Sequence, residues 1–146
     1  MQRISQLQSL SHDHHHALVL ARRCRVSASA ANEQRTHEVW EQVRVVFARD
    51  LEPHFQIEEA CLLPALEQAG QQPLVDRIRV EHAALRDLAG IAFASAGEVE
   101  RFGILLDAHV RYEEREVFET AQTCLSADAL ERIAEACRNM PRGVAG

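Results

Sequence analysis

The chain has 146 residues, of which 47% are hydrophobic and 26% are charged, so it has the size and composition of one globular domain with a real core. Its formal net charge of −6 argues against a nucleic-acid partner, because phosphates require a basic protein surface. It contains no apolar run of about eighteen residues and no signal-peptide pattern, so we expect no membrane span and a cytoplasmic location.

The apolar residues recur with a helical period, which predicts an all-α protein. The expected helices cover, in chain order, about residues 5–29 (beginning at Ser5 or Ser11), 33–68, 74–95, 98–120 and 126–138. Pro53 and Pro64 predict a kink in the second helix, and Gly97 is expected to break the third. Four long helices with short connections favour an antiparallel up-down-up-down four-helix bundle, with a short extra C-terminal helix capped by Ser126. We expect a single domain over 1–146, with its bundle core at about 5–121.

Two segments, His54 to Glu59 and His109 to Glu114, repeat the pattern His-x-x-x-Glu-Glu. A spacing of four residues places each His and the first Glu on one helix face, about one turn apart. Glu58 and Glu113 share their rows with apolar residues, so both carboxylates are expected to be buried. The neighbouring residues Glu59 and Glu114 turn away by about 100° and are expected to be solvated.

The first and third helices each supply a histidine to the predicted interior. His82 lies on an apolar stripe. Within the cluster His12-Asp13-His14-His15-His16, helical phase favours His14 as the inward residue, because apolar residues lie seven positions before and after it. His12 is the weaker rival, whereas His15 and His16 are expected to face outward.

A lone His-x-x-x-Glu is usually a solvated ion pair, and a lone buried His is usually a hydrogen-bonded core residue. When the two pairs and the two histidines occur in one chain, these ordinary interpretations become less favourable, since burying two uncompensated carboxylates costs several kcal/mol each. A divalent cation removes that cost, so the pattern predicts a metal site. Imidazole and carboxylate ligands suit iron, manganese or zinc, and bridging carboxylates with terminal imidazoles favour a pair of irons.

Four other side chains near these rows have less certain roles. Tyr112 could hydrogen-bond a ligand, and Glu116 could support the site from outside the ligand set. Cys61 and Cys124 follow the inward rows and are expected to be packing residues, with all four cysteines reduced.

The motifs resemble those of the hemerythrin-like, or HHE cation-binding, domains, which are non-haem di-iron four-helix bundles. The resemblance rests on His54-Phe-x-x-Glu-Glu followed by Leu62-Leu-Pro-Ala-Leu66, on His109-x-x-Tyr-Glu-Glu, and on the dipeptides Asp13-His14 and Glu81-His82. It extends from about His12 to Thr120.

The resemblance implies a complete ligand set: His14, His54, Glu58, His82, His109 and Glu113. Glu58 and Glu113 would bridge two irons, His14 and His54 would cap one, and His82 and His109 the other, with an oxo or hydroxo bridge between the metals. The oxygen-carrying members have another His where this chain has Ile78, and a fourth-helix Asp where it has Glu113. One iron would therefore be a ligand short and more open, as in sensing or stress-related members rather than oxygen stores.

We expect a di-iron protein that binds O2, NO or peroxide for sensing, scavenging or iron handling, with a protein partner if it is a sensor. An iron-dependent peroxidase or oxidase is the first alternative, although no separate acid–base group supports it. The second is a structural zinc- or manganese-binding interaction module.

Overall fold

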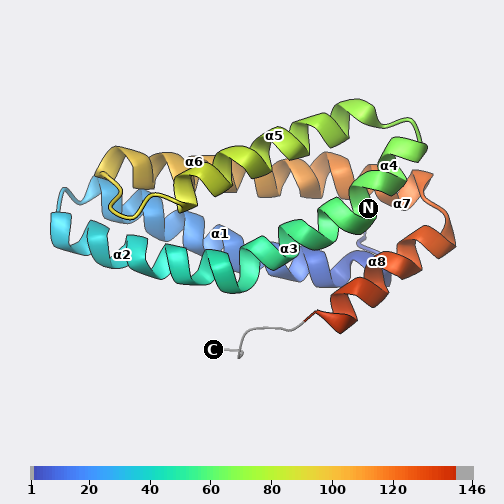
Figure 1. Cartoon of the computed structure of the whole chain (residues 1–146), viewed down its shortest axis with the longest axis horizontal. Helices are drawn as coiled ribbons and strands as arrows, with labels where there is room; N and C mark the ends of the chain where they lie inside the picture. The colour runs from blue at the N-terminus through green and yellow to red at the C-terminus, as the bar shows by residue number, and fades with distance from the viewer. Residues whose placement is uncertain (1, 141–146) are drawn as a thin grey trace.

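The computed structural model describes residues 2–140, and in this part of the chain it contains helices and turns but no strand. Figure 1 shows the long helical stretches lying beside one another along the longest axis. The α-helices are α1 (Gln8–Ser29), α2 (Glu33–Val46), α3 (Glu52–Ile57), α4 (Leu63–Gln68), α5 (Gln72–Ala89), α6 (Ala96–Tyr112), α7 (Phe118–Cys124) and α8 (Ala127–Asn139). A 3-10 turn (Ser5–Leu7) precedes α1. The all-helical expectation is confirmed, and a helical bundle fits it.

The second long stretch runs without a break from α2 through α4, with π-helical segments at Phe47–Leu51 and Glu58–Leu62. Each segment lies just before a proline, and its exit residue donates to the carbonyl five residues back: Glu52 to Phe47, and Leu63 to Glu58. Because proline lacks an N–H and its ring crowds the preceding turn, the hydrogen-bond ladder widens there. The chain bends where a kink is expected, as Figure 1 shows between α2 and α4.

The boundary between the third and fourth long helices differs from the prediction. α5 ends at Ala89 rather than near Ser95, and Gly97 lies inside the first turn of α6. A capping box sets where α6 begins: the Ser95 side chain accepts from the Glu98 backbone N–H, and the Glu98 side chain accepts from the Ser95 backbone N–H. Trp40 Nε1 also donates to the Ile91 carbonyl at 2.8 Å, which holds this connection against α2.

The apolar core consists of two clusters. One is built around Trp40, Phe47 and Phe102, and the other around Leu10, Leu66 and Phe118. Each long helical stretch contributes residues to both clusters, and in each stretch a buried histidine lies close to the point where the contribution changes from one cluster to the other. The order of the two clusters along the chain alternates from one stretch to the next. The buried histidines are therefore at the same level of the bundle, between two apolar halves.

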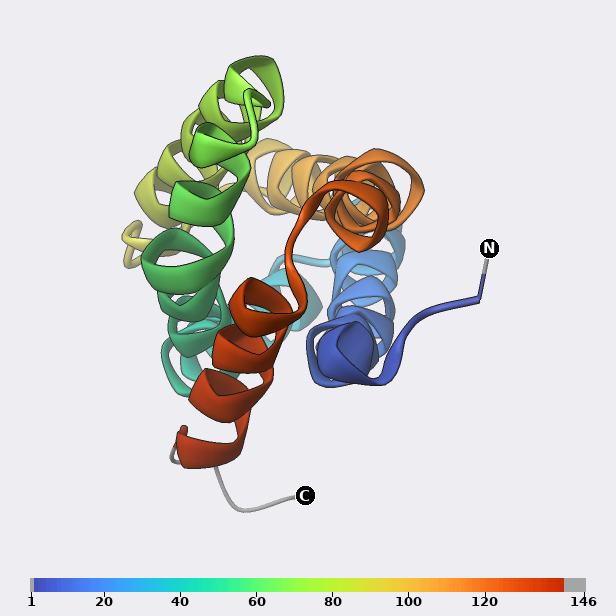
Figure 2. The same cartoon turned by 90° about the vertical axis from the view of Figure 1, so that its right-hand side faces the viewer.

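The last helix, α8, closes one end of the bundle. It contacts the Ser5–Leu7 turn and the Glu58–Leu62 segment, and it lies between α3–α4 and α1 in the end-on view of Figure 2. Ser126 caps it by accepting from the Ala129 N–H, and Leu130, Ile133 and Cys137 are buried. None of the helices in the described part of the chain is both long and apolar enough to cross a bilayer.

The closest helix pairing joins α1 and α6. At Gly103, in the middle of α6, an added Cβ would lie 2.7 Å from the Ala21 carbonyl oxygen and 2.9 Å from the Cys24 Cβ. Glycine is required there because its missing side chain lets the two backbones approach. The pairing sets the distance between the helices that carry His14 and His109.

Candidate metal centre

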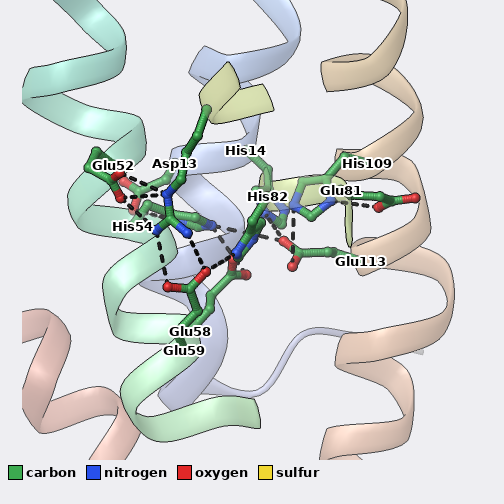
Figure 3. A network of polar contacts seen from close by, with 11 residues as sticks. Asp13, His14, Glu52, His54, Glu58, Glu59, Glu81, His82, His109 and Glu113 are labelled. Atoms are coloured by element: carbon green, nitrogen blue, oxygen red, sulfur yellow. Dashed lines mark hydrogen bonds and ion pairs between the residues drawn. The ribbon is translucent and has the colours of Figure 1, made fainter. Parts of the chain in front are cut away.

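Six polar side chains meet between the two apolar clusters, although each is surrounded by core residues. They are His14 from α1, His54 from α3, Glu58 from the following π-helical segment, His82 from α5, His109 from α6, and Glu113 from the π-helical segment Glu113–Val117. Both carboxylates are 0% exposed and none of the four imidazoles exceeds 3%. Figure 3 shows these side chains converging from separate helices. All six residues proposed from sequence are brought together.

The imidazoles point their Nε2 atoms at the two carboxylates. His82 Nε2 is 3.1 Å from Glu58 Oε1, and His54 Nε2 is 3.3 Å from Glu58 Oε2. On the other side, Glu113 lies 2.8 Å from His14 Nε2 and 3.5 Å from His109 Nε2. Each carboxylate is thus approached by two imidazoles from two different helices.

The cluster divides into two overlapping sets of potential ligands. His14 and His54 form one set with Glu58 and Glu113, and His82 and His109 form the other with the same two carboxylates. Within each set the ligand atoms lie within 4.8 Å of one another. Two neighbouring cations that share both carboxylates match this arrangement.

The hydrogen bonds within the cluster do not satisfy all of its polar atoms. Four buried atoms make no hydrogen bond of acceptable geometry and face one another only as ion pairs: His54 Nε2 and Glu58 Oε2 at 3.3 Å, and His109 Nε2 and Glu113 Oε2 at 3.5 Å. A buried polar atom without a partner costs about 1–3 kcal/mol, and more when it is charged. All four are good ligand atoms for a cation, so the residues present fit a metal pair.

A second set of acids holds the outer side of every imidazole, and we call Asp13, Glu59, Glu81 and Glu114 the outer carboxylates. The Nδ1 distances are 3.0 Å for His54 to Asp13, 2.7 Å for His82 to Glu59, 2.7 Å for His109 to Glu81, and 3.2 Å for His14 to Glu114. Each acid comes from a different long helical stretch than the imidazole it holds. The four contacts therefore form a closed ring around the bundle, from the α1 stretch to the α2–α4 stretch, to α5, to the α6–α7 stretch and back to α1.

This ring sets the tautomer of each imidazole. A carboxylate can only accept, so each Nδ1 must carry the proton that it donates outward. In the neutral imidazole the lone pair is then on Nε2, which points inward at the candidate site. Such outer acids are the usual means of orienting a metal-binding histidine.

The outer carboxylates correct one prediction. Glu59 and Glu114 are not simply solvated, because each is half-buried against a buried imidazole. The sequence motifs include Asp13 and Glu81 in dipeptides but predict no role for them. The signal that could have found all four is that each outer carboxylate is the sequence neighbour of a candidate ligand, rotated by about 100° towards the next helix.

Arginines support three of the outer carboxylates from the surface. Arg86 donates to Glu59 at 2.8 Å, Arg3 to Glu114 at 2.8 Å, and Arg77 to Glu81 at 2.9 Å. Arg86 also contacts Glu52, and Ser11 donates to Glu114. Guanidinium, carboxylate and imidazole thus follow one another from the surface to the interior on three sides of the site.

The acids also change the protonation of the buried groups. Burial alone would lower the pKa of His54, but the facing Glu58 and Asp13 carboxylates raise that pKa well above its usual value. The pKa values of His14 and His82 are raised in the same way, by Glu113 and Glu58. Burial would raise the pKa of Glu58, yet His54 and His82 hold it well below the usual range. Protons therefore occupy positions that cations would take, and metal binding should release them.

Aromatic rings and aliphatic side chains surround the imidazoles. Phe55 stacks on His82 with ring centroids 3.9 Å apart, and Phe118 stacks on His14 at 5.1 Å. A small space beside Asp13, His14, His54 and His109 is bounded on its other sides by Ala17, Leu51, Phe55, Leu106 and Val110. The site thus has an apolar neighbour that excludes water.

The remaining sequence candidates lie outside the cluster. Glu116 is exposed and does not support the site. The Arg77 guanidinium lies over the Tyr112 ring, with its carbon 3.6 Å from the ring centroid. Burial raises the pKa of the Tyr112 phenol. Ile78 is fully buried in the apolar core.

The burial of the cysteines and of the other N-terminal histidines can also be compared with the sequence expectations. Cys124 is exposed, which corrects the expectation of an inward packing residue, whereas Cys61 is half-buried and packs against the second apolar cluster. Cys124 is the last residue of α7, where the helix ends and its side chain leaves the core. His12, His15 and His16 are exposed, so His14 is the inward histidine, as the helical phase predicts.

A helical bundle that encloses two overlapping sets of imidazole and carboxylate side chains is typical of cation-binding bundle proteins. In a comparison with protein families, the hemerythrin HHE cation-binding domain matches residues 5–121. The chain therefore belongs to this family, which confirms the resemblance seen in its motifs. Searches of curated proteins and of solved structures found no match.

Proposed function

We propose that the chain binds two iron ions between Glu58 and Glu113 and uses them to bind O2, NO or peroxide for sensing, scavenging or iron handling. The observation that supports it is the sharing of both carboxylates by two imidazole pairs, together with four buried ligand atoms that make no hydrogen bond of acceptable geometry. One cation would leave two of the imidazoles unused. Imidazole and carboxylate together, with no thiolate in either set, suit iron.

The protein's own residues would define what the metals can do. Each set offers two imidazoles besides the two shared carboxylates, and Ile78 offers no further ligand, so a small molecule could still reach a metal. Iron in such a site supplies redox chemistry and affinity for diatomic ligands. The outer carboxylates orient the imidazoles, and the stacked Phe55 and Phe118 keep bulk water away.

The proposal extends to the architecture and the setting of the chain. It takes the fold as one domain, an antiparallel up-down-up-down bundle with a short extra C-terminal helix, as the alternating order of the two apolar clusters supports. It takes the location as cytoplasmic, and a sensing role would require a protein partner to transmit the signal.

The test of this function is an optical titration. Protein containing about two irons per chain is reduced without oxygen and then exposed separately to O2 and to NO. We expect a distinct spectral change with at least one gas, and none in a Glu58→Ala variant. Iron that stays bound while the spectrum responds to neither gas nor to peroxide would contradict the proposal.

Two measurements separate the alternatives. Sustained peroxide consumption by the iron-loaded protein, with many turnovers per chain, would indicate a peroxidase. Zinc or manganese in protein purified without added metal, and an inability to exchange it for iron, would indicate a structural site.

The outer carboxylates should contribute to metal affinity without touching the metal. In Glu59→Ala, His82 loses the acceptor that orients its ring, so we expect the metal dissociation constant to rise about 10–100-fold. Glu52→Ala is the matched control, because Glu52 contacts the same Arg86 but no imidazole. Competition with a chelator of known affinity measures both variants. Equal affinities in the two would show that the outer contact does not matter.

A further inference from the structure

The α1 turn that carries His14 also carries three exposed histidines, which neither the candidate metal centre nor the ring of outer carboxylates uses. His12 and His16 are four residues apart, so they lie on one face of the helix about one turn apart. His15 is also exposed, and its ring lies edge-on to that of His16 with centroids 5.8 Å apart, but no contact between its nitrogens and the His12–His16 pair is formed. Buried His14 is on the opposite side of the helix from this exposed surface.

The two exposed rings of His12 and His16 point at each other. Their Nε2 atoms are 3.4 Å apart, and the ring centroids are 5.0 Å apart with the planes nearly perpendicular. The separation exceeds the range of about 2.7–3.2 Å typical of protein N–H···O hydrogen bonds, so a direct bond between the rings would be weak. Two nitrogens bound to one tetrahedral zinc at about 2.1 Å would lie about 3.4 Å apart. The contact is thus a long hydrogen bond at most, and its distance also fits a shared ion.

We infer that His12 and His16 form a second, solvent-exposed site that binds one divalent transition-metal ion. The site is separate from the candidate metal centre, with which it shares no ligand. Two imidazoles four residues apart on a helix are a known way to bind zinc, and water can fill the remaining positions. Because the helix already holds both rings in place, the second imidazole binds at a high effective concentration.

The test uses Zn2+ as the probe and compares variants of the full chain. Wild type, His12→Ala, His16→Ala and His15→Ala are equilibrated with micromolar Zn2+, after loading with iron, and zinc and iron are then measured separately. We expect wild type and His15→Ala to hold one more zinc per chain than His12→Ala and His16→Ala. The zinc dissociation constant at this site should rise at least about tenfold in either of the latter two.

His15→Ala is the matched control, because it removes an exposed imidazole from the same turn. Alanine favours helix, and all three positions are exposed, so circular dichroism should show folded protein in every case. Equal zinc in wild type, His12→Ala and His16→Ala would overturn the inference. So would an equal loss of zinc in His15→Ala, because the ion would then belong to the whole histidine tract.

Failure of this inference and failure of the proposed function are distinguishable. The iron content should be the same in all four proteins, since none of the changes touches the six buried ligands. Iron absent from wild type would contradict the proposed function alone, whereas the zinc difference between His16→Ala and His15→Ala tests the exposed pair.

Discussion

Glu58→Gln should remove both metal ions from the protein. Glu58 belongs to both overlapping ligand sets and is fully buried, so its loss affects each metal. Glutamine keeps the shape of the side chain but removes the negative charge that offsets the cations. We expect iron per chain to fall from about two to near zero, measured by elemental analysis after gel filtration. Glu113→Gln should give the same result, for the same reason.

The matched control for this pair is Glu116→Gln. Glu116 lies in the same π-helical segment as Glu113 but is exposed, so its change removes one charge without touching the cluster. It should keep the iron content of wild type. Iron retained in Glu58→Gln, with circular dichroism showing an intact fold, would contradict the assignment of Glu58 as a shared ligand.

Gly103→Ala should lower the stability of the fold by about 1–3 kcal/mol, the usual cost of overpacking a core. The added Cβ would lie 2.7 Å from the Ala21 carbonyl oxygen, a backbone atom that cannot move away by changing rotamer. Alanine gains about 1 kcal/mol in helix propensity over glycine, but the separation of α1 from α6 should outweigh that gain. Chemical denaturation of the metal-free protein measures the free energy of unfolding.

Gly97→Ala provides the comparison on the same helix. An added Cβ there would approach only Ser95 Oγ, at 3.9 Å, which is ordinary van der Waals contact. This variant should be as stable as wild type or slightly more stable. If Gly103→Ala were no less stable than Gly97→Ala, the close approach of α1 and α6 would not be required. Since α1 carries His14 and α6 carries His109, we also expect weaker metal binding in Gly103→Ala alone.

The helices and the six inward side chains could be predicted because both follow from the helical periodicity of the apolar residues. In the N-terminal cluster, for example, apolar residues seven positions away distinguish His14 from His15 and His16, and the burial of His14 agrees. The start of α6 could have been placed by the spacing of Ser95 and Glu98. Gly97 suggests a break instead, but in the structure it lies in the first turn of α6, where a glycine is tolerated.

The outer carboxylates were harder to predict, because their partners lie on other helices. Glu59 reads as a solvated residue when only its own helix is considered, and its role depends on how α5 places His82 beside it. The same holds for Asp13, which contacts His54 from 41 residues away. Helical phase gives the direction of a side chain relative to its own axis, but the rotation of neighbouring helices depends on packing such as the contact at Gly103.

The most direct test of the account is an anomalous-scattering crystal structure of the iron-loaded protein. The account predicts two peaks between Glu58 and Glu113, one bound by His14 and His54 and the other by His82 and His109. A single peak, or peaks away from these two carboxylates, would contradict it.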